Sequence, residues 1–271
     1  MDDIDRFLKE DIGEEGDITS NSLFAEEISQ AHILAKENCV VAGLEETRMV
    51  FERIGVCIEL LLNDGDFVKE KTIVAEIKGP VRSILLGERL ALNFICRMSG
   101  IASETRKIVD ICRDINPHVE VAATRKTTPG FRKYEKKAVV FGGGKPHRYG
   151  LYDAVMIKDN HIKCVGSVEE AISRVKKRTY DKIIEVEVEN ERDAIVAAEM
   201  KVDVIMLDNL PPETAKRLAK KIREIDADVL VEISGGVTPN NIVKYASFAD
   251  RISLGYLTHS IKNKDFSLEL K

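Results

Sequence analysis

The chain has 271 residues, 44% hydrophobic and 32% charged, which is enough to bury the core of one large α/β domain or two smaller ones. Its 41 lysines and arginines against 46 aspartates and glutamates give a net charge of −5, which argues against a nucleic-acid-binding protein, and no apolar run approaches the about 18 residues of a membrane span. The five cysteines form no CxxC pair, which argues against a zinc site or a disulfide framework and favours a reducing compartment, the cytoplasm.

The pattern over residues 1–103 predicts an N-terminal α+β sandwich domain. The first residues are acidic and lack the apolar core of a signal peptide. Short runs of alternating polar and apolar residues follow, with turns predicted at Asp64-Gly65 and Gly79-Pro80. A helical segment over 87–112 leads into the next part of the chain.

From about residue 119, short apolar runs alternate with segments of helical periodicity. Nearly continuous apolar strands between helices are typical of parallel βαβ units. We expect a catalytic domain over 104–255 and a C-terminal segment, 256–271, that returns to the N-terminal domain. Such strands fit either an α/β barrel or an open doubly wound sheet. The apolar runs are 119–126, 153–160, 183–190, 202–209, 228–236 and 251–259.

Two helix starts in this part carry capping residues. Ser167, followed three positions later by Glu170, predicts a capping box. Thr238-Pro239 predicts an N-cap followed by proline at the first helical position.

The ends of the strands favour the barrel. Nearly every apolar run ends in a group that can do chemistry, and in a barrel all strand carboxyl ends converge on one face. An open sheet would instead concentrate such groups at one switch point. We therefore predict a TIM-like parallel barrel, complete or incomplete. The groups at the ends are Arg125, Lys126, Lys158, Asp159, Glu187, Glu189, Asp208, Ser234, Gly235, Gly236 and Gly255.

Positive charge is concentrated between Thr124 and Arg148, where eight lysines and arginines face one acid. Lys133, Lys136 and Lys137 are typical of a solvated helix face. His147 and Arg148 differ, because they follow three glycines in the segment FGGGKPHRYG (141–150). Cations on a glycine loop and at strand ends indicate a site for a multiply charged anion.

The late strands predict a phosphate site. Ser234-Gly235-Gly236 is followed by TPNN, an arrangement in which backbone N–H groups can meet a phosphate at the end of a barrel strand. Gly255 closes the last strand, although alone it is typical of an ordinary turn.

Several segments stand in order and together resemble the quinolinate phosphoribosyltransferase family over nearly the whole chain. The family usually has asparagine where this loop has Pro146, and at that position the chain is closer to the molybdenum-transport-associated ModD relatives. The segments are EDIGEEGDITS (10–20), ERLALNFICRMSGIAS (88–103), TRKTTPGFR (124–132), GGGKPHRYGLYDAVMIKDNHI (142–162), EVEVEN (185–190), IMLDNL (205–210) and EISGGVTPNNI (232–242).

The resemblance implies a decarboxylating phosphoribosyl transfer in NAD biosynthesis. Quinolinate and phosphoribosyl pyrophosphate would give nicotinate mononucleotide, pyrophosphate and CO2. It further implies a homodimer with shared active sites, in which Arg89 reaches the neighbouring subunit's pocket. Neither a nucleic acid nor a membrane is an expected partner.

The resemblance also implies a role for each candidate residue. Glu187 and Asp208 would hold Mg²⁺ with the substrate diphosphate, as hard carboxylate oxygens commonly do. Lys126, Lys158, Glu187 and Asp208 would be catalytic. The quinolinate pocket would contain Arg125, Lys126, His147, Arg148 and Lys158, and the 5′-phosphate would lie against Ser234, Gly235, Gly236 and Gly255, with His259 nearby.

Three alternatives stay open. A ModD-like phosphoribosyltransferase would act on a different acceptor. A non-catalytic anion-binding barrel would need no acidic pair, so Glu187 and Asp208 count against it. A sugar-phosphate lyase or aldolase would need a Schiff-base lysine at a strand end, where Lys158 is the candidate.

Overall fold

The structure, a computed structural model, describes residues 3–178 and 181–271. The chain divides into two compact units. The sheet unit comprises Met1–Arg106, Val140–Gly142 and Ile261–Lys271, and the barrel unit comprises Lys107–Val139 and Gly143–Ser260. In the described part of the chain, no helix is both long and apolar enough to cross a membrane.

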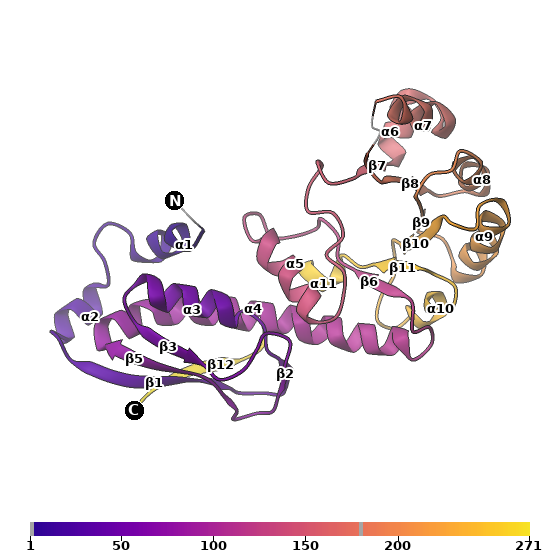
Figure 1. The fold of residues 1–271 in the computed structure, drawn as a ribbon. Coiled ribbons are helices and arrows are strands. Elements are labelled where there is room, and N and C mark those ends of the chain that lie inside the picture. Colours follow the sequence, from indigo (N-terminus) through magenta and orange to yellow (C-terminus); the bar gives the residue numbers. More distant parts are fainter. Residues whose placement is uncertain (1–2, 179–180) are drawn as a thin grey trace. The chain divides into compact units, whose positions relative to one another are not determined.

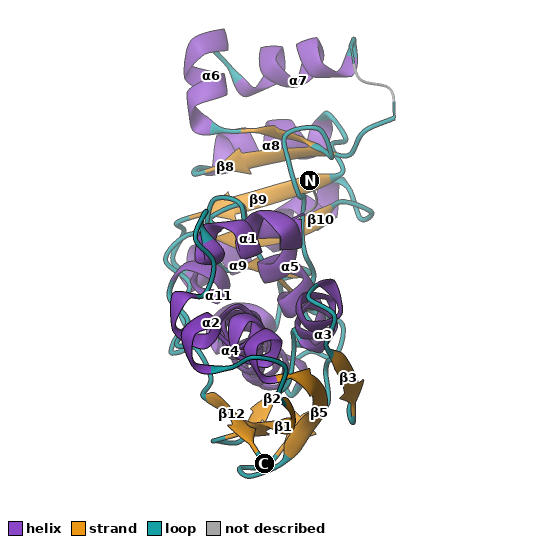
Figure 2. Ribbon diagram, turned by 90° about the vertical axis from the view of Figure 1, so that its left-hand side faces the viewer, coloured by secondary structure: helices purple, strands orange, loops and turns teal. Residues whose placement is uncertain are grey.

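The sheet unit is built on a four-stranded antiparallel sheet of order β12-β1-β5-β3. The C-terminal strand β12 pairs with β1 along one edge of this sheet. Helices α3 and α4 cover one face of the sheet (Figure 1, Figure 2). The elements are α1 (Asp3–Ile12), α2 (Ile18–Leu23), β1 (Ile28–Ala35), β2 (Cys39–Val40), α3 (Leu44–Arg53), β3 (Cys57–Leu60), β4 (Phe67–Val68), β5 (Ile73–Pro80), α4 (Val81–Arg113) and β12 (Phe266–Leu270).

Helix α4 begins directly after β5, at Val81, earlier than the predicted start at residue 87. Helix α4 contains a glycine, Gly100, at the point where the C-terminal segment of the chain passes close to the helix. A Cβ added to Gly100 would lie 3.1 Å from the Asn263 Cα atom of the C-terminal segment. Glycine at position 100 therefore lets the backbone of the C-terminal segment lie against the helix, where a larger side chain would not fit.

The barrel unit contains six parallel strands in the order β6-β11-β10-β9-β8-β7. Among the described residues β6 and β7 are not paired, so the TIM-like barrel is incomplete. An incomplete barrel was one of the two forms that the sequence predicted. Helices α7, α8 and α9 lie outside the curved sheet (Figure 1). The strands are β6 (Glu120–Ala122), β7 (Val155–Ile157), β8 (Ile184–Val188), β9 (Val204–Asp208), β10 (Leu230–Ser234) and β11 (Arg251–Ser253).

Two helix starts were predicted in this unit, at Ser167 and at Thr238, and only the first agrees with the structure. The Ser167 hydroxyl accepts the Glu170 N–H, which is the N-cap half of the capping box predicted for α7, whereas the Glu170 carboxylate accepts a hydrogen bond from Arg174. The helix predicted from Pro239 is wrong, since α10 begins only at Val243. Asn241 explains the delay, because its amide binds the Thr238 N–H and the Gly236 carbonyl and so holds a turn. The helices are α5 (Arg132–Phe141), α6 (Asp159–Val165), α7 (Val168–Lys176), α8 (Glu191–Glu199), α9 (Pro212–Ile225), α10 (Val243–Ala246) and α11 (Tyr256–His259).

The middle strands form the core of the barrel unit. Val186, Ile205, Val231 and Ile252 are fully buried on four neighbouring strands. Burial on both faces explains why these runs are almost continuously apolar in the sequence. Since the strands are parallel, their carboxyl ends share one face; Ser234 pairs in register with Asp208 there.

Candidate active site

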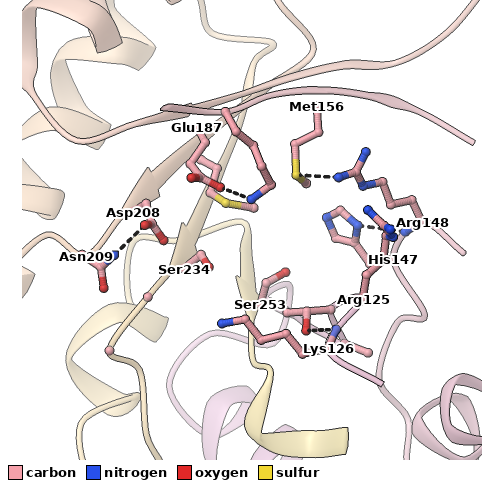
Figure 3. Close-up of a pocket in the computed structure, with 16 residues that line it drawn as sticks. Arg125, Lys126, His147, Arg148, Met156, Glu187, Asp208, Asn209, Ser234 and Ser253 are labelled. Carbon is pink, nitrogen blue, oxygen red and sulfur yellow. Dashed lines mark hydrogen bonds and ion pairs between the residues drawn. The ribbon is translucent and has the colours of Figure 1, made fainter. Parts of the chain in front are cut away.

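A cavity of about 560 Å³ opens at the carboxyl ends of the barrel strands (Figure 3). Ten of the residues singled out from the sequence line it, although they come from segments far apart in the chain. Those ten are Arg125, Lys126, His147, Arg148, Lys158, Glu187, Asp208, Ser234, Gly235 and Gly236.

The cavity has a cationic wall formed by Arg125 and Arg148 (Figure 3). Arg148 makes two weak contacts from its guanidinium, a long one of 3.4 Å to the Ala154 carbonyl and one of 3.0 Å to the Met156 thioether sulfur, which is a weak acceptor. Burial and then the neighbouring Arg125 lower the pKa of Arg148. Arg125 Nε is buried and has no hydrogen-bond partner among the described residues. Two neighbouring guanidinium groups that form no ion pair with a carboxylate in the described part of the chain are suited to bind an anion.

The loop that carries Arg125 and Lys126 is held by a buried glutamate. Glu135, on α5, accepts hydrogen bonds from both the N–H and the hydroxyl of Thr128. The Thr124 hydroxyl also accepts the Lys126 N–H at 3.1 Å. These local bonds turn the chain sharply after β6, so two cations that follow an apolar strand remain at the cavity.

The opposite side of the cavity is acidic. Glu187 and Asp208 end the neighbouring strands β8 and β9. Burial and then the Glu187 charge raise the pKa of Asp208. Lys158 Nζ lies 2.6 Å from Glu187 Oε2, and Asn209 Nδ2 donates to Asp208 Oδ2 over 2.6 Å. Two carboxylates close enough for the charge of Glu187 to raise the pKa of Asp208 are suited to accept a cation between them.

The glycine turn after β10 closes against Asn209. Gly235 and Gly236 have φ values of +75° and +61°, in the left-handed region. A Cβ added to Gly235 would overlap Asn209 Oδ1 and lie 2.7 Å from the Asn209 backbone nitrogen. The turn therefore needs glycine for both conformation and space.

Gly255 and His259 do not themselves line the cavity, but they adjoin Lys126. A Cβ on Gly255 would come within 2.9 Å of Lys126 Cδ and 3.0 Å of His259 Nε2. The Lys126 stem therefore passes directly over the glycine. Arg89 lies in the sheet unit, where it lines a different cavity together with Asp17 and Leu86.

His147 lines the cavity with its ring, but both ring nitrogens face protein groups. Nδ1 accepts the Arg148 backbone N–H at 2.8 Å (Figure 3). Nε2 lies 3.4 Å from Glu185 and 3.4 Å from Glu232. Burial and then the Glu232 charge raise the pKa of Glu185 to about 8.

Lys136 corrects the expectation of a solvated lysine face. It is fully buried, and its ammonium group donates to the Pro146 carbonyl of the glycine loop. It also lies 5.4 Å from the centre of the Tyr149 ring. Burial and then the Arg132 charge lower the pKa of Lys136 to about 8. This lysine supports the loop from beneath, whereas Lys133 is exposed.

Sequence reasoning missed several residues of the site. Asn209 and Ser253 line the cavity, and Glu185 and Glu232 lie buried beneath His147. For Glu185 a pattern was present, because alternation along β8 places it on the same side as Glu187. For Glu232 the pattern is a single acid within an otherwise apolar strand. Burying such an acid costs free energy unless it has partners, so its position indicates a buried polar contact.

Comparisons with known proteins cover almost the whole chain. Residues 17–99 match the family described as quinolinate phosphoribosyl transferase, N-terminal domain, and residues 101–269 match its C-terminal domain. A probable nicotinate-nucleotide pyrophosphorylase [carboxylating] of Archaeoglobus fulgidus is 45% identical over 244 residues, which cover 89% of this chain and 94% of that protein. The human nicotinate-nucleotide pyrophosphorylase [carboxylating] is 40% identical, covering 89% and 82%. The crystal structure of NadC from Streptococcus pyogenes superposes with a TM-score of 0.92 at 38% identity, covering 99% and 95%.

Proposed function

This chain belongs to the quinolinate phosphoribosyltransferase family, and from that premise we propose how its cavity divides the work between two substrates. The enzyme transfers a phosphoribosyl group from phosphoribosyl pyrophosphate to quinolinate with loss of CO2, a step of NAD biosynthesis. This assignment rests on one observation: a cationic wall and an acidic wall face each other across the same cavity.

The cationic wall binds quinolinate, a compact dianion. Arg125 and Arg148 supply planar guanidinium groups that can bind carboxylates through paired hydrogen bonds. Lys126 and Lys158 add point charges at the rim. The buried Arg125 Nε without a partner supports this assignment, because a ligand carboxylate would satisfy it.

The acidic wall holds Mg²⁺ together with the diphosphate. Glu187 and Asp208 offer hard oxygen donors, and burial and then the Glu187 charge raise the pKa of Asp208, an effect that a cation bound by both carboxylates would oppose. Two protein carboxylates completed by substrate phosphates fit Mg²⁺ well. When bound, the metal would neutralise charge on the departing pyrophosphate. Lys158 competes for Glu187, so this ion pair must open on loading.

The glycine turn binds the 5′-phosphate. Gly236 leaves space for an anion beside the backbone, because a Cβ there would meet only Asn209 Oδ1, at 3.9 Å. Gly235 allows the turn to pack against Asn209, and Ser234 supplies a hydroxyl at the same strand end. Gly255 and His259, next to Lys126, extend this end of the site. The binding is therefore mainly by backbone groups, which a phosphate can approach closely where no Cβ intervenes.

The chemistry then depends on position and charge. The quinolinate ring nitrogen attacks the ribose carbon as pyrophosphate leaves, and the acidic wall stabilises the positive charge that develops on the ribose. Loss of CO2 leaves an electron pair on the adjacent ring carbon, which the cationic wall stabilises until a proton arrives. Each substrate is fixed by several charged groups, which supplies the orientation that the transfer requires.

We also propose a cytoplasmic homodimer whose subunits share their active sites. All five cysteines lie in the described part of the chain and are free, which favours a reducing compartment. Arg89 lies on α4 of the sheet unit and belongs to none of the groups that line the cavity of the barrel unit. It would enter the cavity of the partner, which a two-fold arrangement allows in both directions.

One assay tests the proposed function. Purified protein with phosphoribosyl pyrophosphate and Mg²⁺ should release CO2 from carboxyl-labelled quinolinate and form nicotinate mononucleotide. Preference for another aromatic acid would instead indicate a ModD-like acceptor specificity. Borohydride trapping of substrate on Lys158 would indicate Schiff-base chemistry, against which its ion pair with Glu187 counts.

A further inference from the structure

The ring of His147 is directed at two buried carboxylates. Its Nε2 lies 3.4 Å from Glu185 Oε2 on β8 and 3.4 Å from Glu232 Oε1 on β10. The three side chains are only 8%, 3% and 0% exposed. Two buried acids that converge on one ring are costly to keep unless the arrangement has a use.

The other ring nitrogen faces the chain. His147 Nδ1 accepts the backbone N–H of Arg148 at 2.8 Å, so in the neutral ring the proton is on Nε2, on the side of the two carboxylates. Within the described residues Nε2 contacts both carboxylates closely but makes no hydrogen bond with either. The backbone of His147 is also in the left-handed region, with φ +52°. A non-glycine residue keeps such a conformation only when its surroundings hold it there.

Glu232 is itself held by two groups, one of which binds the same oxygen that faces His147. The Ser253 hydroxyl donates to its Oε1 and Arg251 Nη1 donates to its Oε2 at 3.3 Å, both from the neighbouring strand β11. A continuous set of contacts thus connects β11 through Glu232 and His147 to the backbone of Arg148. The glycines that precede this loop add no stiffness of their own, so the anchoring must come from such contacts.

We propose that Glu232 is a positioning residue for quinolinate binding: it orients the His147 ring, which in turn fixes the backbone that carries Arg148. The proposal rests on the proposed function of the cationic wall. Arg148 needs this support because, within the described residues, its guanidinium bonds only to the Ala154 carbonyl, at 3.4 Å, and to the weakly accepting Met156 sulfur. A shift of the loop would misplace the guanidinium relative to the substrate carboxylate, at a cost mainly to binding.

The first test is Glu232→Gln, which keeps the size of the side chain. The amide must place its NH2 group either at the Oε1 position, against the Ser253 hydroxyl and His147 Nε2–H, or at the Oε2 position, against Arg251 Nη1. Either placement disturbs a contact that holds this side chain against His147. The expected result is a KM for quinolinate raised about tenfold, equivalent to about 1.4 kcal/mol, with kcat and the KM for phosphoribosyl pyrophosphate within about twofold. Glu46→Gln is the matched control, because Glu46 is 3% exposed and lies on α3 of the sheet unit.

A double-mutant cycle separates positioning from general damage. His147→Asn tolerates the positive φ and keeps an acceptor near the Nδ1 position, but it lacks the Nε2 arm. If Glu232 acts through the ring, Glu232→Gln in the His147→Asn background should raise the quinolinate KM no further. Multiplied effects of the two substitutions would overturn the proposal, since independent sites add in free energy.

Other outcomes also decide. If Glu232→Gln fails to fold, Ser253→Ala loosens the same carboxylate and should raise the quinolinate KM about threefold, equivalent to about 0.65 kcal/mol; an unchanged KM overturns the proposal.

A metal test gives a further outcome. If chelator-treated protein gains a visible absorption band on adding Co²⁺, and Glu232→Gln loses that band, then His147, Glu185 and Glu232 form a metal site and the positioning proposal is overturned. Wild-type protein without quinolinate activity would overturn the proposed function itself, whereas active wild type with an unaffected Glu232→Gln variant overturns only the role of Glu232.

Discussion

Lys158 Nζ lies 2.6 Å from Glu187 Oε2, so an ion pair joins the ends of β7 and β8 inside the cavity. The lysine belongs to the proposed quinolinate wall, and the glutamate to the proposed Mg²⁺ site. The lysine side chain is 42% exposed, and an ion pair of this kind contributes little net stability. The two charges are therefore free to exchange partners when the substrates bind.

Removing one arginine of the cationic wall should weaken quinolinate binding strongly. Arg125→Ala and Arg148→Ala should each cost about 2–5 kcal/mol of binding free energy, because a carboxylate in the cavity would lose its partner. Calorimetric titration measures this, with exposed Lys133→Ala as the control for a lost charge. Wild-type affinity in a folded variant would refute the assignment.

The acidic wall should control the need for magnesium. Glu187→Gln and Asp208→Asn should raise the Mg²⁺ concentration for half-maximal rate about tenfold, equivalent to about 1.4 kcal/mol, and leave quinolinate affinity unchanged. Lys158→Met should lower that concentration, because it frees Glu187. Steady-state rates over a Mg²⁺ series distinguish the two directions. Normal Mg²⁺ dependence combined with lost quinolinate binding would reverse the assignment of the walls.

The glycine turn permits a matched comparison. Gly235 and Gly55 both have φ +75°, but a Cβ would collide with Asn209 only at Gly235 and would meet open space at Gly55. Gly55→Ala should therefore show only backbone strain, about 1 kcal/mol of unfolding free energy. Gly235→Ala should in addition raise the KM for phosphoribosyl pyrophosphate. Equal kinetics in the two variants would remove the phosphate role of the turn.

The buried Lys136 predicts a pH dependence of stability. Its pKa is lowered to about 8 from 10.5, so between these values the unfolded chain binds more protons than the folded one. Stability relative to Lys136→Met should accordingly rise with pH through this window, by at most about 1.4 kcal/mol per unit, and should be flat below pH 8. Urea unfolding at a series of pH values measures the difference. Parallel curves for wild type and variant would contradict it.

Shared active sites predict complementation between inactive chains. Arg89→Ala and Arg125→Ala homodimers should both be inactive. After subunit exchange, a heterodimer would contain one cavity with both defects and one with neither, so about half of the activity per heterodimer should return. If exchange is verified by mass spectrometry and the mixture stays inactive, Arg89 serves its own chain or none.

The order of elements, the parallel strands and most cavity residues followed from the sequence alone. Arg125, Glu187 and Asp208 each follow an apolar run, and parallel strands in a barrel bring their carboxyl ends together whatever their separation in the chain. Each strand of a parallel barrel ends on the same face, so residues at the strand ends could be expected to lie close together from the sequence alone.

Only the tertiary structure decided which side chains are buried. Lys133, Lys136 and Lys137 look alike in the sequence, yet Lys136 alone of the three is fully buried and bonded to the Pro146 carbonyl. His147 and Glu232 meet although they come from a loop and a strand far apart in the chain. Burial depends on what packs around a group from distant segments, and the lowered pKa of Lys136 and the orientation of the His147 ring both depend on burial. These are therefore properties of the packed fold, and the local pattern of residues does not contain them.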